Sequence, residues 1–528
     1  MRKYKYLTLG GIILAMNLTS CVGDLNVEPT DESNLQDITT KQQYMEYLAG
    51  CYYGLVKEGG ITSGATGGES VYTRIMVNLQ ELPTDEMVIS GNWNDAGIVD
   101  LVYATPSSDN HWIYDMYSRL NAHIAVCNQF IQDIDKAGDL FTADEIKEMK
   151  AEVRVLRDLG YYNMIDMFGH GPWADENHKV GTDAPTYNRA QLFDAIVNDL
   201  VDAVPQVYPA SQQEYGRVSR EAGYALLAKM YLNAEVYLGK GNGKWQQCAD
   251  ACQAIINSGM VLAKNYAYLF CGSNAKYVAS STKGATGEIL WSVPQDAVTM
   301  QCFGGTTYLS GGAYPASLNA TEKKKTGVGA DGWGGPHMRP ETVNNFTDPN
   351  DVRAMFYSEG FNNDIKDIST WGGEDSDGYM CVKFVYTNED DYYNTSGTSG
   401  SGSIFNSADF PIFRLADIYL MMVECEINGA NVEGGALQYY QAVQRRAGIT
   451  ALANSLPDKR ELLDERNREL YWEGHRRSDM IRLGFYTGSD YIWKWKGGVY
   501  EGTSTESFRN LLPIPTPFVS TLGQNQGY

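Results

Sequence analysis

The segment with the greatest density of reactive side chains is "ELYWEGHRRSDMIRLG", residues 469–484, which holds six ionisable groups and a histidine around one glycine. Glu469 and Glu473 are four residues apart, a spacing that predicts a shared helical face. A glycosidase needs two carboxylates across a cleft, one of them with a raised pKa. Arg476 and Arg477 follow closely and would instead keep both carboxylates ionised through ion pairs. We therefore predict a structural role for this segment.

The composition is that of an ordinary globular protein with a large core, since 43% of the 528 residues are apolar and 20% are charged. The formal net charge is −23, and loss of the basic leader described next would make it about −26. Such an acidic chain argues against nucleic acid or anionic lipid as the main partner, because both require a basic surface. The 36 tyrosines and 10 tryptophans supply rings that suit ligands with a polar rim and an apolar face.

The amino-terminal residues 1–20 have the pattern of an export signal, with basic residues followed by an apolar stretch too short to span a bilayer. The sequence "LTSC" ends at Cys21 and resembles the bacterial lipoprotein box, which predicts a lipidated cysteine. A plain secretory leader with a chance cysteine is the alternative. Residues 21–38 are polar and without a period, as expected of a flexible tether. No later segment approaches ~20 uninterrupted apolar residues, so the lipid would be the membrane anchor.

The remaining cysteines and the acidic loops do not predict a metal site. No CxxC occurs, and Cys248 and Cys252 lie in an alanine-rich helical run where small core residues are expected. The acidic stretches 374–378 and 388–394 resemble calcium loops, but the first lacks the distal glutamate of an EF-hand, and we interpret both as solvated. We expect neither a metal nor a cofactor.

Helical periodicity dominates the well-patterned parts of the chain. Thr142 and Glu145 have the spacing of a capping box, and apolar residues recur at helical spacing after them. The alanine-rich helices that follow predict tetratricopeptide-type pairing, since small residues allow close approach. Two helix pairs are predicted, 219–239 with 245–259 and 410–430 with 435–449. The fold class is therefore mostly α, with the helical scaffold mainly at 39–59, 110–262 and 410–485.

Two regions lack this periodicity, residues 60–109 and residues 265–409. Glycine, serine, threonine and asparagine are frequent in both, and "TSGTSGSGS" at 395–403 is of low complexity. Long irregular segments in a compact protein are usually functional. These two loop-rich regions are where we expect a ligand to bind.

Seven motifs are spread along the chain: "LTSC" (18–21), "ELPTDE" (81–86), "AEVRVLRDLGYYNMIDMFGHGPW" (151–173), "FPIFRLADIYLMMVECE" (410–426), "ERNRELYWEGHRRSDMIRLG" (465–484), "LLPIPTP" (511–517) and "QNQGY" (524–528). Together they resemble those of the SusD/RagB family of outer-membrane lipoproteins of Bacteroidetes, and the resemblance extends over essentially the whole chain. Within the family, "YIWKWKGGVYEGTSTESF" at 491–508 is similar to the late segment of the starch-binding member.

The resemblance implies one SusD-like domain over 39–528, with tetratricopeptide-type helix pairs as scaffold and a long loop-rich ligand-binding portion. It implies a lipoprotein at the cell surface that binds glycan, catalyses no reaction and serves a SusC-like TonB-dependent transporter. The first choice of ligand is a starch-like α-glucan. A different polysaccharide or a host glycan in the same family role is the alternative, and a glycoside hydrolase is a further one.

The resemblance also implies an arc of aromatic rings on which sugars stack. Trp333 in "DGWGG" matches one ring of the starch-binding relative, and Phe303 in "CFGGTTY" stands where the relative has tyrosine. Trp93 in "GNWND" takes the place of the remaining tryptophan, with a shifted local alignment. Each ring would bury roughly 50–100 Å² of sugar, worth about 1–2.5 kcal/mol.

The polar edge of this site is carried over in the same way. Arg74 in "ESVYTR" matches a sugar-bonding arginine, and Asn94 matches an asparagine at the edge of the arc. Thr66 stands where the relative has an aspartate. A guanidinium and an amide would bond sugar hydroxyls while the rings contact the apolar C–H face.

Overall fold

The computed structural model describes residues 38–56, 58, 68–89, 95–178, 182–315, 318–328, 332–368, 377–392 and 403–528. The predicted leader, the predicted lipid-bearing Cys21 and nearly all of the predicted tether lie outside the described residues. Within the part of the chain that is described, no helix is long and apolar enough to cross a membrane.

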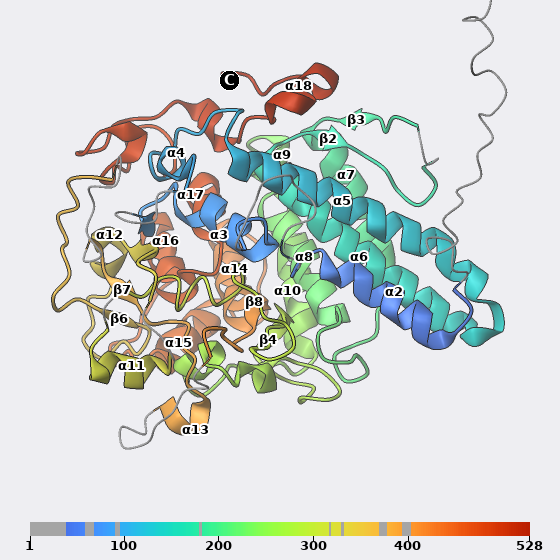
Figure 1. Ribbon diagram of the computed structural model, residues 1–528, viewed down its shortest axis with the longest axis horizontal. Helices are drawn as coiled ribbons and strands as arrows, with labels where there is room; N and C mark the ends of the chain where they lie inside the picture. Colours follow the sequence, from blue (N-terminus) through green and yellow to red (C-terminus); the bar gives the residue numbers. More distant parts are fainter. Residues whose placement is uncertain are drawn as a thin grey trace, which may run out of the picture.

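Among the described residues, helices form most of the regular secondary structure and the strands are few and short, which confirms the predicted fold class. Figure 1 shows α2, α5 and α6 side by side; α8 packs against α6, and α10 packs against α8 and α14. The α-helices are α2 (Lys41–Tyr53), α3 (Tyr72–Glu81), α4 (Ile98–Val102), α5 (His111–Asp133), α6 (Ala143–Met167), α7 (Arg189–Ala203), α8 (Arg220–Leu232), α9 (Ala234–Leu238), α10 (Trp245–Asn257), α11 (Ala320–Thr326), α12 (Pro340–Val343), α13 (Glu389–Tyr392), α14 (Leu415–Ile427), α15 (Leu437–Arg446), α16 (Lys459–Leu470), α17 (Arg476–Leu483) and α18 (Thr516–Leu522). Short 3-10 helices lie at Ile134–Leu140, Val204–Gln206, Tyr266–Phe270, Asn274–Tyr277, Lys496–Gly498 and Ser507–Asn510.

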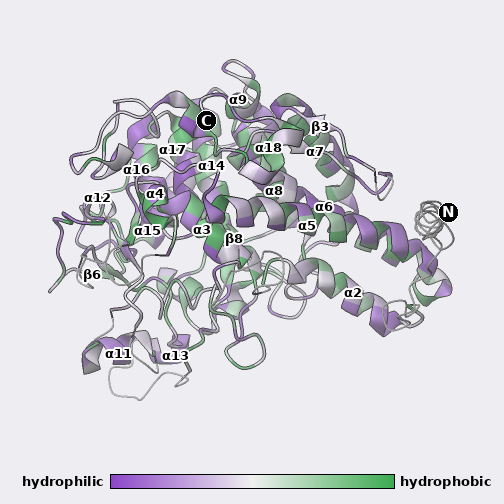
Figure 2. Ribbon diagram, turned by 45° about the horizontal axis from the view of Figure 1, so that its top comes forward, coloured by the Kyte–Doolittle hydropathy of each residue, from purple (hydrophilic) through white to green (hydrophobic). Residues whose placement is uncertain are grey.

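The start of α6 confirms the predicted capping box. The Thr142 hydroxyl accepts a hydrogen bond from the Glu145 backbone N–H at 3.2 Å, and the Glu145 carboxylate accepts one from the Thr142 N–H at 2.8 Å. These bonds satisfy backbone donors that a helix start otherwise leaves unpaired. In Figure 2 hydrophilic and hydrophobic residues alternate along α5 and α6. α5 has a core face and a more exposed face, whereas α6 is buried on nearly all sides from Ala151 onward, including the polar side chains of Arg157 and Asp158.

The helix pair predicted for 219–259 is present, with one difference. α8 packs closely against α10, but the single helix expected over 219–239 breaks at Asn233, where α8 ends and α9 follows. Cys248 and Cys252 of α10 are fully buried, in agreement with their predicted place in the core. Small side chains at this interface permit the close approach that tetratricopeptide-type pairs need.

The strands are short and pair two by two in antiparallel fashion. One pair joins the two loop-rich regions, since Met87 of the first lies opposite Met338 of the second. Another occupies the start of the predicted helix 410–430, so that α14 begins only at Leu415. The pairs are β1 (Met87–Ile89) with β5 (Pro336–Met338), β2 (Gly171–Pro172) with β3 (Thr186–Tyr187), β4 (Ile289–Val293) with β8 (Phe410–Arg414), and β6 (Phe356–Tyr357) with β7 (Met380–Cys381). Region 60–109 is also more regular than predicted, because it contains α3 and α4.

The arginine-rich segment near the C-terminus does not form one continuous helix. α16 ends at Leu470, α17 begins at Arg476, and Trp472 between them has a positive φ of 64°. The shared helical face predicted for Glu469 and Glu473 is therefore wrong. A left-handed backbone at a bulky residue is costly unless the surroundings hold it in place.

Two buried carboxyl groups hold the turn between α16 and α17. Glu86 accepts a hydrogen bond from the backbone N–H of Trp472, and Glu81 accepts one from the N–H of His475 at 2.9 Å. Burial raises the pKa of Glu86 to about 7, and burial together with the neighbouring Glu86 raises the pKa of Glu81 well above its ordinary value. The pair therefore retains a proton near neutral pH, and that proton removes the repulsion between two adjacent buried carboxylates.

Glu469 and Glu473 belong to a buried network of charges whose other members come from distant elements. Arg414 of β8 lies 3.0 Å from Glu469 and 2.6 Å from Glu473, and Lys383 lies 2.7 Å from Glu473. Burial alone would raise the pKa of Glu469, but Arg446 and Arg414 hold it at about 2. The pKa of Glu473 is likewise lowered against the effect of burial, by Arg414 and Lys383. Both carboxylates are therefore ionised, as the sequence predicts.

The arginines that follow in the sequence have other partners. Arg476 forms an ion pair with Asp85 at 2.7 Å, and Arg477 donates to the carbonyl oxygen of Asn510 at 3.0 Å. The predicted pairing of Glu469 and Glu473 with these arginines is thus wrong, although the predicted structural role agrees with the observed contacts. The segment connects α3, β8 and the C-terminal region.

Candidate functional site

Three partly exposed aromatic rings from distant parts of the sequence meet at one place. The ring centroids of Phe303 and Trp333 are 5.6 Å apart with their planes inclined by 55°. Phe405 adds a third ring, 4.7 Å from Phe303 and inclined by 53°. We call Phe303, Trp333 and Phe405 the ring cluster. The structure thus brings together the two predicted rings that it describes and adds a third that the resemblance did not supply.

Backbone contacts fix Trp333 against the segment that carries Phe303. The Trp333 N–H donates to the carbonyl oxygen of Gly311 at 3.0 Å, and the Gly334 N–H donates to that of Tyr314 at 2.8 Å. A Cβ atom at Gly332 would lie 2.0 Å from the Tyr314 carbonyl oxygen. Glycine is therefore required beside the tryptophan, because only glycine allows so close an approach of two backbones.

Arg74 lies on α3 and is almost completely buried, with 2% of its surface exposed. It forms an ion pair with Asp95, and its guanidinium lies over the rings of Tyr308, at 4.6 Å, and Trp112, at 5.1 Å. Tyr308 follows Phe303 by five residues, so Arg74 contacts the same segment that carries Phe303 of the ring cluster. The carboxylate of Asp95, rather than the guanidinium, is the more exposed member of the ion pair.

Burial shifts the pKa values of two groups near Arg74, Asp95 and His111. Burial raises the pKa of Asp95, and Arg74 opposes that rise. Burial also lowers the pKa of His111, against the opposing effect of Asp115 and Asp95. A histidine with a lowered pKa is neutral at physiological pH and offers one donor and one acceptor.

The remaining predicted site residues, Thr66, Trp93 and Asn94, lie outside the described residues. The chain that follows Thr66 lies against the ring cluster, because a Cβ atom at Gly68 would be 2.4 Å from the backbone nitrogen of Gly304. Asp95, directly after Asn94, contacts Arg74. The described ends of both segments therefore lie beside the segment that carries Phe303.

Sequence reasoning did not find Phe405. It follows the low-complexity stretch 395–403 directly, and no matched motif covers it. No local sequence pattern identifies it, because its contact with Phe303 joins segments that lie about 100 residues apart in the sequence. Asn406 next to it is buried and donates to the hydroxyl of Ser310 at 3.0 Å, which fixes this segment against the one that carries Phe303.

The acidic loop at 388–394 is engaged by neighbouring side chains where the structure describes it. Glu389 forms an ion pair with Lys276 and accepts a hydrogen bond from Tyr277 at 2.8 Å. Among the described residues, no group of three or more histidine, cysteine, aspartate or glutamate side chains is arranged to hold a metal ion. Most of the stretch 374–378 lies outside the described residues.

Comparison with known families matches two parts of the chain. Residues 353–528 match the model of the SusD family, and residues 55–232 match the model described as "Starch-binding associating with outer membrane". Both parts of the chain are thus similar to proteins of the SusD family. It is similar to the starch-binding protein SusD of Bacteroides thetaiotaomicron, with 27% identity over 98% of this chain and 97% of that protein.

Solved structures have the same fold. The surface glycan-binding protein A of Bacteroides thetaiotaomicron, solved in complex with laminarihexaose, superposes with a TM-score of 0.68 and 19% identity, covering 92% of this chain and all of that one. A laminarin-binding SusD-like protein superposes with a TM-score of 0.69 and 21% identity, covering 93% of this chain and all of that one. The predicted SusD-like fold is confirmed.

Proposed function

We propose that this protein is a cell-surface lipoprotein that captures starch-like α-glucan and passes it to a SusC-like TonB-dependent transporter. The observation that carries the proposal is the ring cluster, in which Phe303, Trp333 and Phe405 meet while each remains partly exposed. Similarity to a starch-binding protein over nearly the full length supports the choice of ligand.

The inclination of the rings suits a curved ligand. Neighbouring planes differ by 55° and 53°, so successive sugars would stack at different angles, as they do along a helical α-glucan. Stacking would be worth about 1–2.5 kcal/mol per ring. Three rings would contribute about 3–7.5 kcal/mol, and an association cost of ~4 kcal/mol or more leaves at most about 3.5 kcal/mol, so the rings alone give binding no tighter than the low millimolar range.

Arg74 would act mainly by holding Asp95. Its guanidinium is buried and paired, so the more exposed Asp95 carboxylate is the better placed acceptor for sugar hydroxyls. Trp93, Asn94 and Thr66 would complete the edge of the site, as the resemblance implies. A charged acceptor at the rim of an aromatic surface fixes the orientation of a stacked sugar.

The cellular role follows the family resemblance. Export with cleavage before Cys21 would leave a lipid in the outer membrane, and residues 21–38 would tether the domain 39–528 to it. The family model that matches residues 55–232 is described as associating with the outer membrane, which supports this location. The tether would allow the protein to deliver glycan to its transporter.

Affinity electrophoresis of the protein lacking residues 1–21 tests the proposal. We expect starch in the gel to retard the protein and mannan, xylan and mucin to leave it unretarded. Trp333→Ala should lose most of the retardation, whereas Tyr439→Ala, which removes a partly exposed ring on α15, should keep it. Absence of retardation by starch would reject the ligand.

A β-glucan is the second candidate ligand. Two structural relatives are described as bound to laminarihexaose or as laminarin-binding, and inclined rings also suit a curved β-1,3-glucan. Laminarin in the same gel separates the candidates. Stronger retardation by laminarin than by starch would assign the site to β-glucan within the same family role.

The hydrolase alternative is disfavoured by the state of the carboxylates. Glu469 and Glu473 are buried and ion-paired, with lowered pKa values, whereas a catalytic acid needs a raised pKa and access to substrate. Incubation with starch should release no reducing ends. Release that is lost in Glu473→Gln while the variant stays folded would reinstate an enzyme.

A further inference from the structure

Arg189 differs from the paired arginines of the protein. It is the first residue of α7, and its Nε atom is buried without a hydrogen-bond partner. Among the described residues its guanidinium has no ion pair, and it lies over the ring of Tyr237 at 4.9 Å. A guanidinium nitrogen that has no protein acceptor can donate a charge-assisted hydrogen bond to an anionic ligand.

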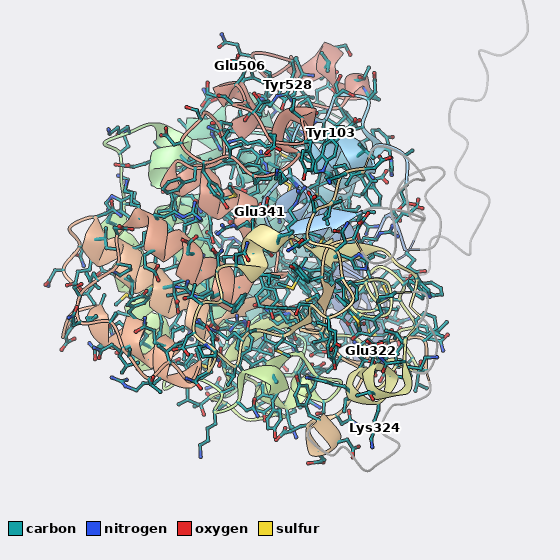
Figure 3. All side chains as sticks on the ribbon, turned by 90° about the vertical axis from the view of Figure 1, so that its left-hand side faces the viewer. Tyr103, Glu322, Lys324, Glu341, Glu506 and Tyr528 are labelled. Carbon is teal, nitrogen blue, oxygen red and sulfur yellow. The ribbon has the colours of Figure 1, made fainter. Side chains whose placement is uncertain are left out.

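Two adjoining cavities share Arg189 and Asn510 as a common wall. The first, of about 270 Å³, lies among α7, α9, α10 and α17, and the second, of about 510 Å³, lies against residues 507–511 and 526–527. Figure 1 shows α7, α9 and the C-terminus on one side of the molecule, and Figure 3 places Glu506 and Tyr528 together at one end. We call the two cavities together the Arg189 cleft.

The first cavity is lined by more cationic than anionic side chains although the whole chain is acidic, with Arg189, Lys240, Lys459 and Arg482 against Glu235 and Glu424. Lys240 and Lys459 line it and have no ion pair among the described residues. Its acidic residues are engaged, because Glu424 pairs with Arg482 at 2.7 Å and Glu235 accepts a backbone hydrogen bond at 3.0 Å. Arg189 and the two lysines therefore leave an excess of positive charge, which attracts an anion.

Aromatic and amide groups complete the cleft. Trp245 at the start of α10 lines the first cavity and is partly exposed, and Asn428 and Asn510 lie around it. The second cavity adds the ring of Phe508 and the polar side chain of Gln526. A ring for the apolar face of a sugar, amides for its hydroxyls and a guanidinium for an acidic group are the components of an acidic-saccharide site.

We propose that the Arg189 cleft is a second saccharide site, which binds a sugar residue bearing a carboxylate or sulfate group. Arg189 bonds the acidic group, Lys240 and Lys459 attract it, and Trp245 stacks on the ring of the same sugar. The second cavity holds the adjacent sugar against Phe508. This site is independent of the ring cluster, since the two share no residue.

The charge on Arg189 fits this role. Burial lowers the pKa of Arg189, and Tyr237 and Asp166 oppose the decrease. Arginine nonetheless stays protonated in proteins. A bound anion would therefore offset the remaining cost of burying most of this guanidinium.

Calorimetry on the protein lacking residues 1–21 tests the proposal with four probes: trigalacturonate, a sulfated galactose trisaccharide, neutral galactotriose and inorganic sulfate. We expect at least one acidic trisaccharide to bind and neutral galactotriose not to bind. Tighter binding of trigalacturonate would indicate a carboxylate site, and tighter binding of the sulfated trisaccharide would indicate a sulfate site. Arg189→Gln should lower the affinity about tenfold or more, and Arg189→Lys should lower it less. Trp245→Ala should lower it about fivefold.

The controls keep a structural defect apart from a binding defect. Arg445→Gln removes an exposed arginine that bonds Gln441 and should bind the acidic probe as the unmodified protein does. Thermal unfolding of Arg189→Gln should show a folded protein, and its retardation by starch should be unchanged.

Failure of both acidic trisaccharides to bind, or unchanged affinity in Arg189→Gln, would overturn the proposal. Binding of inorganic sulfate as tight as that of the trisaccharides, with no effect of Trp245→Ala, would overturn the saccharide assignment.

Discussion

The buried charge network around Arg414 and the ring cluster differ in their side-chain chemistry and in their exposure to solvent. In the network, Glu469 and Glu473 have lost contact with solvent and have cationic partners within 3.3 Å. In the ring cluster, Phe303 and Trp333 keep part of their surface exposed although they contact each other. Charged residues here maintain the fold, while apolar rings are available for a ligand. The density of ionisable groups in segment 469–484 therefore reflects buried ion pairs that maintain the fold.

The two regions also differ in what a substitution should do. A buried ion pair adds little net stability, but removal of one partner leaves an uncompensated charge in a low dielectric. A half-exposed ring contributes little to the core, and its removal mainly subtracts ligand contact. The comparison thus predicts large stability effects in the network and binding effects without unfolding in the ring cluster.

The largest effect is expected for Arg414→Met. This change leaves Glu288, Glu469 and Glu473 buried without their shared guanidinium, and should lower the free energy of unfolding by about 3–5 kcal/mol. Urea unfolding followed by tryptophan fluorescence measures it. The exposed Arg445→Met should change stability by less than about 0.5 kcal/mol. Equal stability of the two variants would contradict the structural assignment of the network.

The carboxyl pair Glu81 and Glu86 predicts a pH dependence of stability. Both folded pKa values are raised, that of Glu86 to about 7, so the folded state binds more protons than the unfolded state above about pH 4.5. Their contribution is complete below that pH and is lost as pH rises through about 7, with a slope of at most ~1.4 kcal/mol per pH unit for one proton.

Glu81→Gln should therefore flatten this slope, because a glutamine can donate to Glu86 without titrating and can still accept the N–H bonds from the turn. Urea unfolding at pH 5, 6, 7 and 8 compares the variant with the unmodified protein. Glu46→Gln, an exposed carboxylate on α2, serves as the matched control and should keep the slope. A slope unchanged by Glu81→Gln would show that the pair retains no proton.

The network also shows what the sequence predicts and what it does not. Helix type follows from local periodicity and capping, so Thr142 and Glu145 were sufficient to locate the start of α6. The break at Trp472 was not predictable, because the carboxylates that hold the turn lie almost 400 residues earlier, at Glu81 and Glu86. Long-range hydrogen bonds here override the helical spacing of Glu469 and Glu473.

The ring cluster likewise shows which part of the candidate site is predictable from the sequence and which part depends on tertiary packing. The resemblance located Phe303 and Trp333, whose rings the structure brings into contact. Phe405 was missed because the contact between the three rings depends on how three loops pack in space, and no local sequence pattern encodes that packing. Arg74 was identified as a polar contact, but its burial between two rings depends on Trp112 and Tyr308, which lie 38 and 234 residues away in the sequence.

Trp333→Ala tests the expected effect of a substitution in the ring cluster. It should weaken starch binding by about 1–2.5 kcal/mol, roughly 5- to 70-fold, because one stacking surface is lost. Its free energy of unfolding should change far less than that of Arg414→Met, since the ring is only partly buried. Calorimetry with maltoheptaose and urea unfolding measure the two quantities on one preparation. A loss of stability as large as that of Arg414→Met would mean that Trp333 belongs to the core.

The smallest effect is expected for Phe303→Tyr, which restores the residue implied by the starch-binding relative. The ring remains in contact with Trp333 and Phe405, so stacking is unchanged and only a hydroxyl is added. At a partly exposed ring this hydroxyl can bond a sugar hydroxyl in the complex and water in the free protein, for a net gain of about 0.5–1.5 kcal/mol in starch affinity. Calorimetry should resolve this gain, and Phe303→Leu, which keeps an apolar side chain without a ring, should instead lose affinity. If the tyrosine variant bound more weakly than the leucine variant, the ring of Phe303 would not be facing the glycan at all.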